Sequence, residues 1–376
     1  MARVDEMARG NRDWVARAMT LIDANRALEV DTPLFELELP EMPGCRMYIK
    51  DETAHPSGSL KHRLARSLFL HAICNGDIGA STAVVEASSG STAISEAYFA
   101  SLLGLKFIAV VPKSTAPAKC EAIKRTGAHI HLVEPRDNVS AVAARLAQEA
   151  GGHFMDQFTY AERATDWRGN NNIAESLFAQ IAAKHAGPPA WVVVGAGTGG
   201  TSATIGRYIR YRPELCATRL MVVDPEQSAF FEYFGGGDRA VTGGCGGIIE
   251  GIGRPRVEAS FMRNVVDEML AVPDAASIAA ARWLEQRFGR RFGPSTGTNI
   301  VGALALAAAV HEGGEPISIA TLACDAGDRY ADTIYDDAWL ASRSIDITIW
   351  QMRLATLAAE PGLLAKDLAR ARGSAA

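Results

Sequence analysis

The sequence predicts an α/β protein of two lobes, each built on a mostly parallel sheet with helices on both faces. Short runs of β-branched and apolar residues alternate with longer helical patterns, which is typical of parallel strands joined by crossover helices. This alternation occurs in two separate series along the 376 residues, a length that allows two or three units at ~150 residues each. Hydrophobic residues make up 48% of the chain, enough for a sizeable core.

The elements follow in order along the chain. In the first series, strands are expected at residues 47–50, 83–86, 107–111 and 130–133, and helices at 60–75, 91–103, 118–126 and 139–150. In the second series, strands are expected at 191–194, 220–223 and 317–322, and helices at 201–212, 275–288 and 299–310. A helix at 12–28 precedes both series, and an amphipathic helical tail follows residue 345. We therefore expect a smaller lobe at 44–157, a larger lobe at 1–43 with 158–344, and a C-terminal tail at 345–376.

Composition and charge exclude several classes of protein. The chain has 38 basic and 43 acidic residues, a net charge of −5, which argues against a nucleic-acid partner. Its longest apolar stretch, residues 301–310, is far shorter than the ~20 residues that a membrane helix needs. The six cysteines are scattered without a CxxC pair, so neither a disulfide framework nor a metal site is expected. The first residues lack the apolar core of a secretory signal, and a cytoplasmic protein is the expectation.

A glycine-rich turn gives the clearest local signal. Residues 191–201 read Trp-Val-Val-Val-Gly-Ala-Gly-Thr-Gly-Gly-Thr, a strand that passes through glycines into a helix. Such a turn presents backbone N–H groups at a helix N-terminus, where a phosphate is favoured. Gly195, Gly197 and Gly200 also fit the G-x-G-x-x-G pattern of dinucleotide sites, and Asp224 ends the next strand. Taken alone, the turn does not choose between a nicotinamide dinucleotide and a single phosphate ester.

Three further segments place reactive or polar groups at helix starts. Lys61 lies in the first turn of a predicted helix, where a cation is disfavoured, so it is either a solvated surface lysine or a lysine held neutral, for example as an imine. Residues 88–92, Ser-Ser-Gly-Ser-Thr, connect a strand to a helix and offer groups for a carboxylate, although they also suit a simple N-cap. Residues 293–298, Gly-Pro-Ser-Thr-Gly-Thr, are expected as a cap before the helix at 299.

Together, in order and spacing, these segments resemble the fold-type II pyridoxal-phosphate enzymes of the cysteine synthase family, over about residues 32–331. The resemblance implies a fold like that of the tryptophan synthase β chain, pyridoxal 5′-phosphate as cofactor, an amino acid as substrate, and a homodimer. It makes Lys61 the Schiff-base lysine, and the tethered amine of that lysine is then the natural base for the substrate α-proton.

The resemblance also assigns the remaining site residues. The phosphate loop corresponds to Gly197, Thr198, Gly199, Gly200 and Thr201, and the hydroxyl partner of the pyridine nitrogen to Ser295. The substrate-binding residues would be Ser88, Ser89, Gly90, Thr92 and Gln157. Ser91 stands where the family usually has an asparagine that contacts both cofactor and substrate.

Particular segments resemble one branch of that family. Residues 86–92, 162–173, 293–299 and 327–333 are similar to the actinobacterial type of L-cysteine desulfhydrase. This implies a lyase that converts L-cysteine to hydrogen sulfide, pyruvate and ammonia. The nearest alternative is a cysteine synthase that joins sulfide to O-acetylserine. An NAD-dependent oxidoreductase rests on the glycine turn alone, and a non-catalytic binding protein of the same fold is disfavoured by an intact Lys61.

Overall fold

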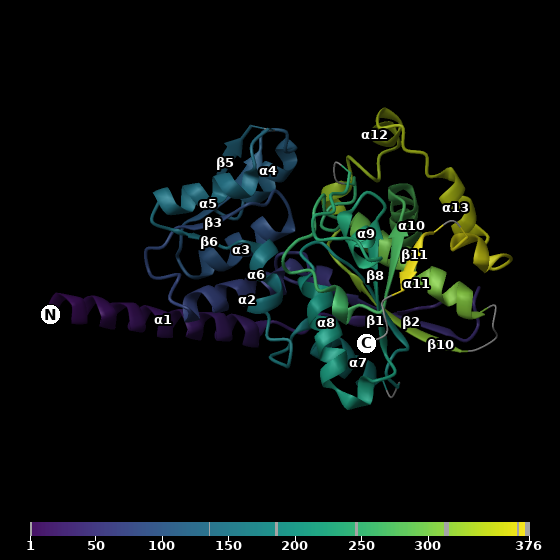
Figure 1. The fold of residues 1–376 in the computed structure, drawn as a ribbon, viewed down its shortest axis with the longest axis horizontal. Helices are drawn as coiled ribbons and strands as arrows, with labels where there is room; N and C mark the ends of the chain where they lie inside the picture. The colour runs from purple at the N-terminus through teal and green to yellow at the C-terminus, as the bar shows by residue number, and fades with distance from the viewer. Residues whose placement is uncertain are drawn as a thin grey trace. The chain divides into compact units, whose positions relative to one another are not determined.

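The computed structural model describes residues 2–134, 136–184, 187–244, 247–311, 316–366 and 368–372, with side chains from residue 11 onward. The chain forms two compact units, drawn in Figure 1. The first comprises Met1–Asp31 and His55–Thr165, and the second comprises Thr32–Ala54 and Asp166–Ala376. Each unit has its own sheet and its own core, so each is considered by itself.

The first unit is a parallel sheet with helical structure packed on both faces. Among its described residues the strand order is β5 (His129–Val133), β4 (Phe107–Pro112), β3 (Val84–Glu86) and β6 (His153–Phe154), all parallel. Its helices are α1 (Ala2–Leu28), α2 (Lys61–Cys74), α3 (Ser91–Leu102), α4 (Pro117–Lys124), α5 (Val139–Glu149) and α6 (Gln157–Ala164). Successive strand residues point to opposite faces. Val84 accordingly packs in the cluster that contains α2 and α3, and Val85 packs in the cluster that contains α5.

The second unit is a larger mixed sheet. Among its described residues the strand order is β1 (Leu34–Leu37), β2 (Cys45–Asp51), β10 (Ile317–Ala323), β7 (Trp191–Gly195), β8 (Arg219–Pro225), β9 (Glu268–Val272) and β11 (Arg370–Arg372). The strands at the two edges, β1 and β11, pair antiparallel, and the others are parallel. The helices are α7 (Ile173–Ala183), α8 (Gly200–Tyr211), α9 (Ala229–Phe234), α10 (Asp274–Phe288), α11 (Pro294–His311), α12 (Asp337–Ser342) and α13 (Thr348–Ala355). The central helix α11 is buried throughout residues 294–308, with polar side chains in its first two turns and apolar or small residues after them.

The unit boundaries differ from those expected for the lobes. Strand β2 was expected in the smaller lobe, but it pairs along its whole length with β10, from Cys45 opposite Ile317 onward. Helix α1 was expected in the larger lobe, but Trp14, Ala18 and Ile22, spaced by four, pack in the core of the first unit. Both differences come from long-range packing, which local periodicity does not report.

The segment expected as a separate tail is part of the second unit's core. Trp350, Leu354 and Leu357 are buried in the same cluster as α10 and α11. Strand β11 then pairs with β9, so the chain returns to the sheet before its end. No helix in the described part of the chain is long and apolar enough to cross a membrane.

Candidate active site

Lys61 lies at the first residue of α2, as the sequence analysis predicts. A turn precedes it in which Gly58 has φ +73°, a conformation that favours glycine. The Lys61 N–H is 3.3 Å from Ser59 Oγ, which satisfies one of the donors at the helix start. Lys61 itself is half-buried, whereas the two following residues, His62 and Arg63, are buried.

Buried polar contacts fix this helix start. His62 Nε2 lies 2.8 Å from Glu29 Oε1, and His62 Nδ1 lies 3.1 Å from Ser57 Oγ. Burial lowers the pKa of His62, and the Glu29 carboxylate partly opposes that shift. Ligand atoms of Glu29, His55 and His62 lie within 4.8 Å of one another, but the first and third are already hydrogen-bonded and the two imidazole rings stack at 4.9 Å. We therefore interpret the cluster as an anchor for the helix that carries Lys61.

The predicted substrate loop lies at the carboxyl edge of the first unit's sheet. It connects the end of β3 to the start of α3, and Gln157 follows the neighbouring parallel strand β6. Parallel neighbours end at the same edge, so the loop and Gln157 are brought together. Thr92 Oγ1 donates to Gln157 Oε1 at 2.8 Å, and both residues are buried. Ser88, Ser89, Gly90 and Ser91 are half-buried, which leaves part of the loop accessible.

The glycine turn of the second unit is a close-packed cradle at the N-terminus of α8. Gly199 is the N-cap with φ +89°, and a Cβ there would lie 2.5 Å from Phe261 Cα. A Cβ on Gly197 would lie 2.1 Å from Gly251 O. The loop is held by its own hydroxyls, since Thr198 Oγ1 accepts the Gly200 N–H at 3.1 Å and Ser202 Oγ donates to Gly199 O at 3.0 Å.

Ser295 lies inside a helix, which corrects the expectation that residues 293–298 form a cap before residue 299. Helix α11 begins at Pro294, a residue suited to a first helical position because it lacks an N–H. One turn later, Asn299 Nδ2 donates to Leu322 O at 3.0 Å, and its buried Oδ1 has no hydrogen-bond partner among the residues that the structure describes. That oxygen lies 3.4 Å from where a Gly195 Cβ would be. Asn299, four residues after Ser295, therefore lies next to the glycine turn within the second unit and was not among the expected site residues.

Asp224 does not behave as the ribose-binding acid of a dinucleotide site. It is fully buried, and burial raises its pKa to about 8. Its Oδ2 accepts the Phe231 N–H at 3.2 Å, so it supports the turn into α9. The G-x-G-x-x-G match therefore lacks the exposed, ionised partner that gives the pattern its meaning.

The asparagine-rich segment at residues 170–172 caps a helix. Asn172 is the N-cap of α7 and accepts the N–H groups of Ala174 and Glu175 at 2.8 and 3.0 Å. Asn170 and Asn171 have positive φ, which asparagine tolerates better than most residues. This local role accounts for the run of three asparagines.

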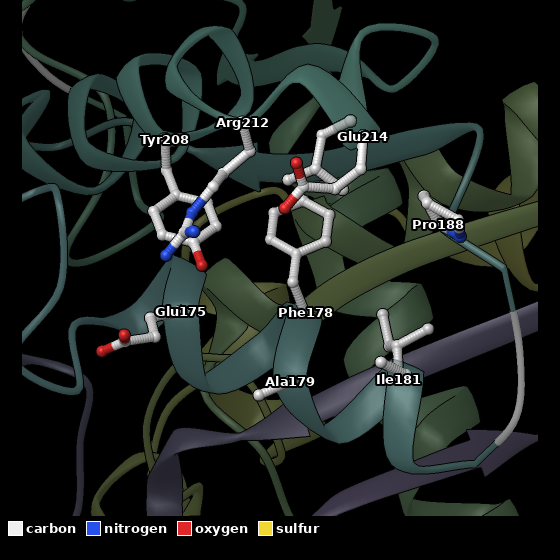
Figure 2. Close-up of a pocket in the computed structure, with 10 residues that line it drawn as sticks. Glu175, Phe178, Ala179, Ile181, Pro188, Tyr208, Arg212 and Glu214 are labelled. Atoms are coloured by element: carbon white, nitrogen blue, oxygen red, sulfur yellow. The ribbon is translucent and has the colours of Figure 1, made fainter.

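A cavity of about 380 Å³ lies between α7 and α8, at the opposite end of α8 from the glycine turn (Figure 2). Its apolar wall includes Phe178, Ile181 and Leu215. The Arg212 guanidinium lies over the Tyr208 ring, 5.1 Å from its centre. None of the predicted site residues lines this cavity, so we do not assign it to the reaction.

The second unit's residues fit a phosphate-bearing cofactor. The first N–H groups of α8 have no carbonyl partner within the helix, and Gly197 and Gly199 let the turn that presents them pack closely against the neighbouring backbone. Asn299 Oδ1, for which the described chain offers no hydrogen-bond donor, adds a polar atom at the same edge of the sheet.

The chain belongs to the family of pyridoxal-phosphate dependent enzymes, whose pattern matches residues 26–325. It is 56% identical over 340 residues to L-cysteine desulfhydrase Cds1 of Mycobacterium tuberculosis, covering 89% of this chain and 92% of that protein. It is 31% identical to a putative cysteine synthase of Sinorhizobium fredii, covering 84% and 90%. The crystal structure of O-ureido-L-serine synthase matches with a TM-score of 0.71 at 25% identity, covering 85% of this chain and 98% of that one. The family, its fold and its cofactor are those that the sequence analysis predicts.

Proposed function

We propose that the protein catalyses pyridoxal-phosphate-dependent β-elimination of L-cysteine to hydrogen sulfide, pyruvate and ammonia. The observation that carries this proposal is the 56% identity to an L-cysteine desulfhydrase over 89% of the chain. The similarity to a putative cysteine synthase is much lower, at 31%.

The cofactor roles in this proposal follow the family resemblance residue by residue. Pyridoxal phosphate, when bound, supplies an electron sink for bonds to the substrate α-carbon. Lys61 would carry the cofactor covalently, and residues 197–201 would hold its phosphate at the start of α8. Ser295 would face the pyridine nitrogen as a neutral hydroxyl, which makes the ring a milder electron sink than a carboxylate partner would. Such a site favours prompt elimination over racemisation, although it suits synthases equally.

The first unit would bind and orient the amino acid. Hydroxyl and N–H groups of Ser88, Ser89, Gly90 and Thr92 would hold the substrate carboxylate, with Gln157 beside Thr92. Lys61 Nζ would take the proton from the α-carbon, because a tethered amine next to that carbon gains from its high local concentration. Thiolate is a fair leaving group, so no strong protein acid is required.

Ser91 is the residue that supports elimination over replacement. A synthase must keep the reactive product of the elimination step enclosed until sulfide arrives and adds to it. A desulfhydrase must instead release that product or allow its hydrolysis. Closure of such sites depends on substrate contacts with a mobile loop. Serine offers one short hydroxyl where asparagine offers both a donor and an acceptor on a longer side chain. We infer that Ser91 holds the loop closed less tightly.

Quaternary state and location are further parts of the proposal. We propose a cytoplasmic homodimer. The apolar side chains of Leu28 and Val30, 85% and 94% exposed, support contact with another chain. A sedimentation experiment that gives a dimer mass would support this, and a monomer at all concentrations would contradict it.

The role of Lys61 is tested by Lys61→Ala, with Lys124→Ala, an exposed lysine of the same unit, as the matched control. Loss of a positioned proton-transfer group typically costs ~10²–10⁴ in rate, and the loss here is at least that large because the cofactor linkage is lost as well. Borohydride reduction of the wild-type protein should attach the cofactor to the peptide that contains residue 61. Attachment at another lysine, or substantial turnover by Lys61→Ala, would show that the assignment is wrong.

A further inference from the structure

Two glutamates that the proposed reaction does not use are buried at the predicted substrate loop. Glu86 is the last residue of β3, directly before the loop, and Glu96 lies in the second turn of α3, directly after it. Both side chains are 0% exposed. Within the part of the chain that the structure describes, neither is in an ion pair, so no cation offsets their charge.

Glu86 connects the two predicted substrate-binding segments. Its Oε1 accepts the Ala87 N–H at 2.6 Å, and its Oε2 accepts the Gln157 N–H at 3.1 Å. The Gln157 side chain in turn accepts the Thr92 hydroxyl at 2.8 Å. An ionised carboxylate is the strongest acceptor for such a pair of donors. Glu86 therefore holds the start of the loop and the start of α6 with one side chain.

Glu96, in contrast to Glu86, is favoured in its protonated form. Neither of its oxygens has an N–H or O–H donor among the described residues, and the group that raises its pKa, after burial, is the Glu86 carboxyl. A buried carboxylate without donors is costly, and two adjacent buried carboxylates are costlier still. Burial, followed by repulsion from Glu86, raises the pKa of Glu96, and burial also raises the pKa of Glu86.

Few other charged groups among the described residues affect the pKa values of Glu86 and Glu96. Asp156, the N-cap of α6, is a further carboxylate whose field raises the pKa of Glu86. On the α2 side, His62 packs against the Phe99 ring of α3 at 4.8 Å and is itself bound to Glu29. None of the described groups that shift the pKa of Glu86 or Glu96 is a cation, so a proton is what can offset the charge of the pair.

We propose that Glu96 is a positioning residue of the substrate site: its carboxylic acid donates a hydrogen bond to Glu86, which keeps Glu86 an ionised double acceptor for Ala87 and Gln157. This inference rests on the proposed function for the role of the loop and Gln157. The proposed role of Glu96 predicts how substrate binding changes with pH. Loss of the Glu96 proton at alkaline pH adds a second buried negative charge, loosens the loop, and weakens binding of the substrate carboxylate more than the proton transfer at Lys61.

The kinetic test compares the wild type with Glu96→Gln and with Glu149→Gln, which replaces an exposed glutamate of α5. Glutamine keeps an N–H donor toward Glu86 but cannot ionise. KM and kcat for L-cysteine are measured from about pH 6 to pH 10, and each wild-type value is divided by the variant value so that the ionisation of cysteine itself cancels. The KM ratio for Glu96→Gln should rise at alkaline pH, by up to about tenfold per pH unit for one proton, while the kcat ratio stays level. The ratios for Glu149→Gln should be flat. A flat KM ratio for Glu96→Gln would overturn the proposal.

A second measurement does not depend on catalysis, and its deciding comparison uses the wild-type protein alone. Hydrogen exchange at the Ala87 and Gln157 amides of the wild type, corrected for intrinsic pH dependence, should lose protection at alkaline pH. Glu96→Gln should keep that protection and Glu86→Gln should lose it at every pH. Constant protection in the wild type would overturn the positioning role even if cysteine is cleaved normally. The predicted exchange pattern without any sulfide release would instead contradict the proposed function and leave the positioning role standing.

Discussion

Replacing Gly199 by alanine should weaken cofactor binding, because the glycine turn tolerates no side chain there. The residue has φ +89°, and an added Cβ would lie 2.5 Å from Phe261 Cα and 2.8 Å from Ser260 O. Left-handed backbone costs an L-residue roughly 1–2 kcal/mol, and overpacking of a well-packed site costs typically ~1–3 kcal/mol. The total strain is therefore about 2–5 kcal/mol.

This strain is divided between the stability of the free protein and the affinity for the cofactor. The turn can relax in the free protein by moving the N–H groups at the start of α8, but the bound phosphate requires them back in place. If binding of the phosphate brings back one third of the strain that the free turn had relaxed, that energy is lost from the binding free energy. Kd for pyridoxal phosphate then rises roughly 3–15-fold, since 1.4 kcal/mol is a factor of ten.

The assay titrates the dialysed protein with pyridoxal phosphate and measures the melting temperature of the cofactor-free form. Gly187→Ala is the control, because no described atom lies within 4 Å of its added Cβ and its φ is not in the left-handed region. The reasoning would be refuted if Gly199→Ala bound the cofactor and melted as the wild type does. Heat stabilisation by a nicotinamide dinucleotide, but not by pyridoxal phosphate, would refute the assignment of the turn altogether.

Two further predictions concern the reaction type and the pH dependence of stability. Ser91→Asn should shift products toward cysteine when sulfide and O-acetylserine are supplied together, as measured by chromatography of both products; an unchanged ratio would mean that the serine is incidental. Burial raises the pKa of Asp224 to about 8 in the folded protein, against about 4 in the unfolded chain, so folding favours the protonated carboxyl. The stability that this gives is fully present below about pH 4 and is lost as the pH rises to about 8. Asp224→Asn cannot ionise, and its free energy of unfolding relative to the wild type should therefore increase over that range by up to a few kcal/mol. Chemical unfolding at several pH values checks this, and a difference independent of pH would show that Asp224 titrates normally.

Much of the local structure is predictable from periodicity and turn residues. The strand and helix starts around Lys61, the loop at 88–92 and the glycine turn are where the sequence pattern indicates, within a few residues. These features are encoded locally, because each is a buried strand or an amphipathic helix beside glycine, serine or threonine. The roles of Lys61, Ser91 and Ser295 stay predictions that rest on the family resemblance.

The long-range features were not predictable from local pattern. Nothing near Cys45–Asp51 indicates that this strand pairs with residues 317–323 rather than with the strand that follows it. The buried carboxyl pair was also missed, although one signal was available. Glu96 lies four residues after Thr92 and four before Ala100, on the helical face that is buried. A charged residue among apolar and small residues on one helical face indicates a buried ionisable group.

The measurement that tests the central claim most directly follows both reactions on one purified, cofactor-saturated sample. One assay supplies L-cysteine and quantifies sulfide, pyruvate and ammonia. The other supplies O-acetylserine with sulfide and quantifies cysteine. We predict equimolar sulfide and pyruvate in the first assay and little cysteine in the second. Efficient formation of cysteine, with no sulfide released from it, would contradict the desulfhydrase function.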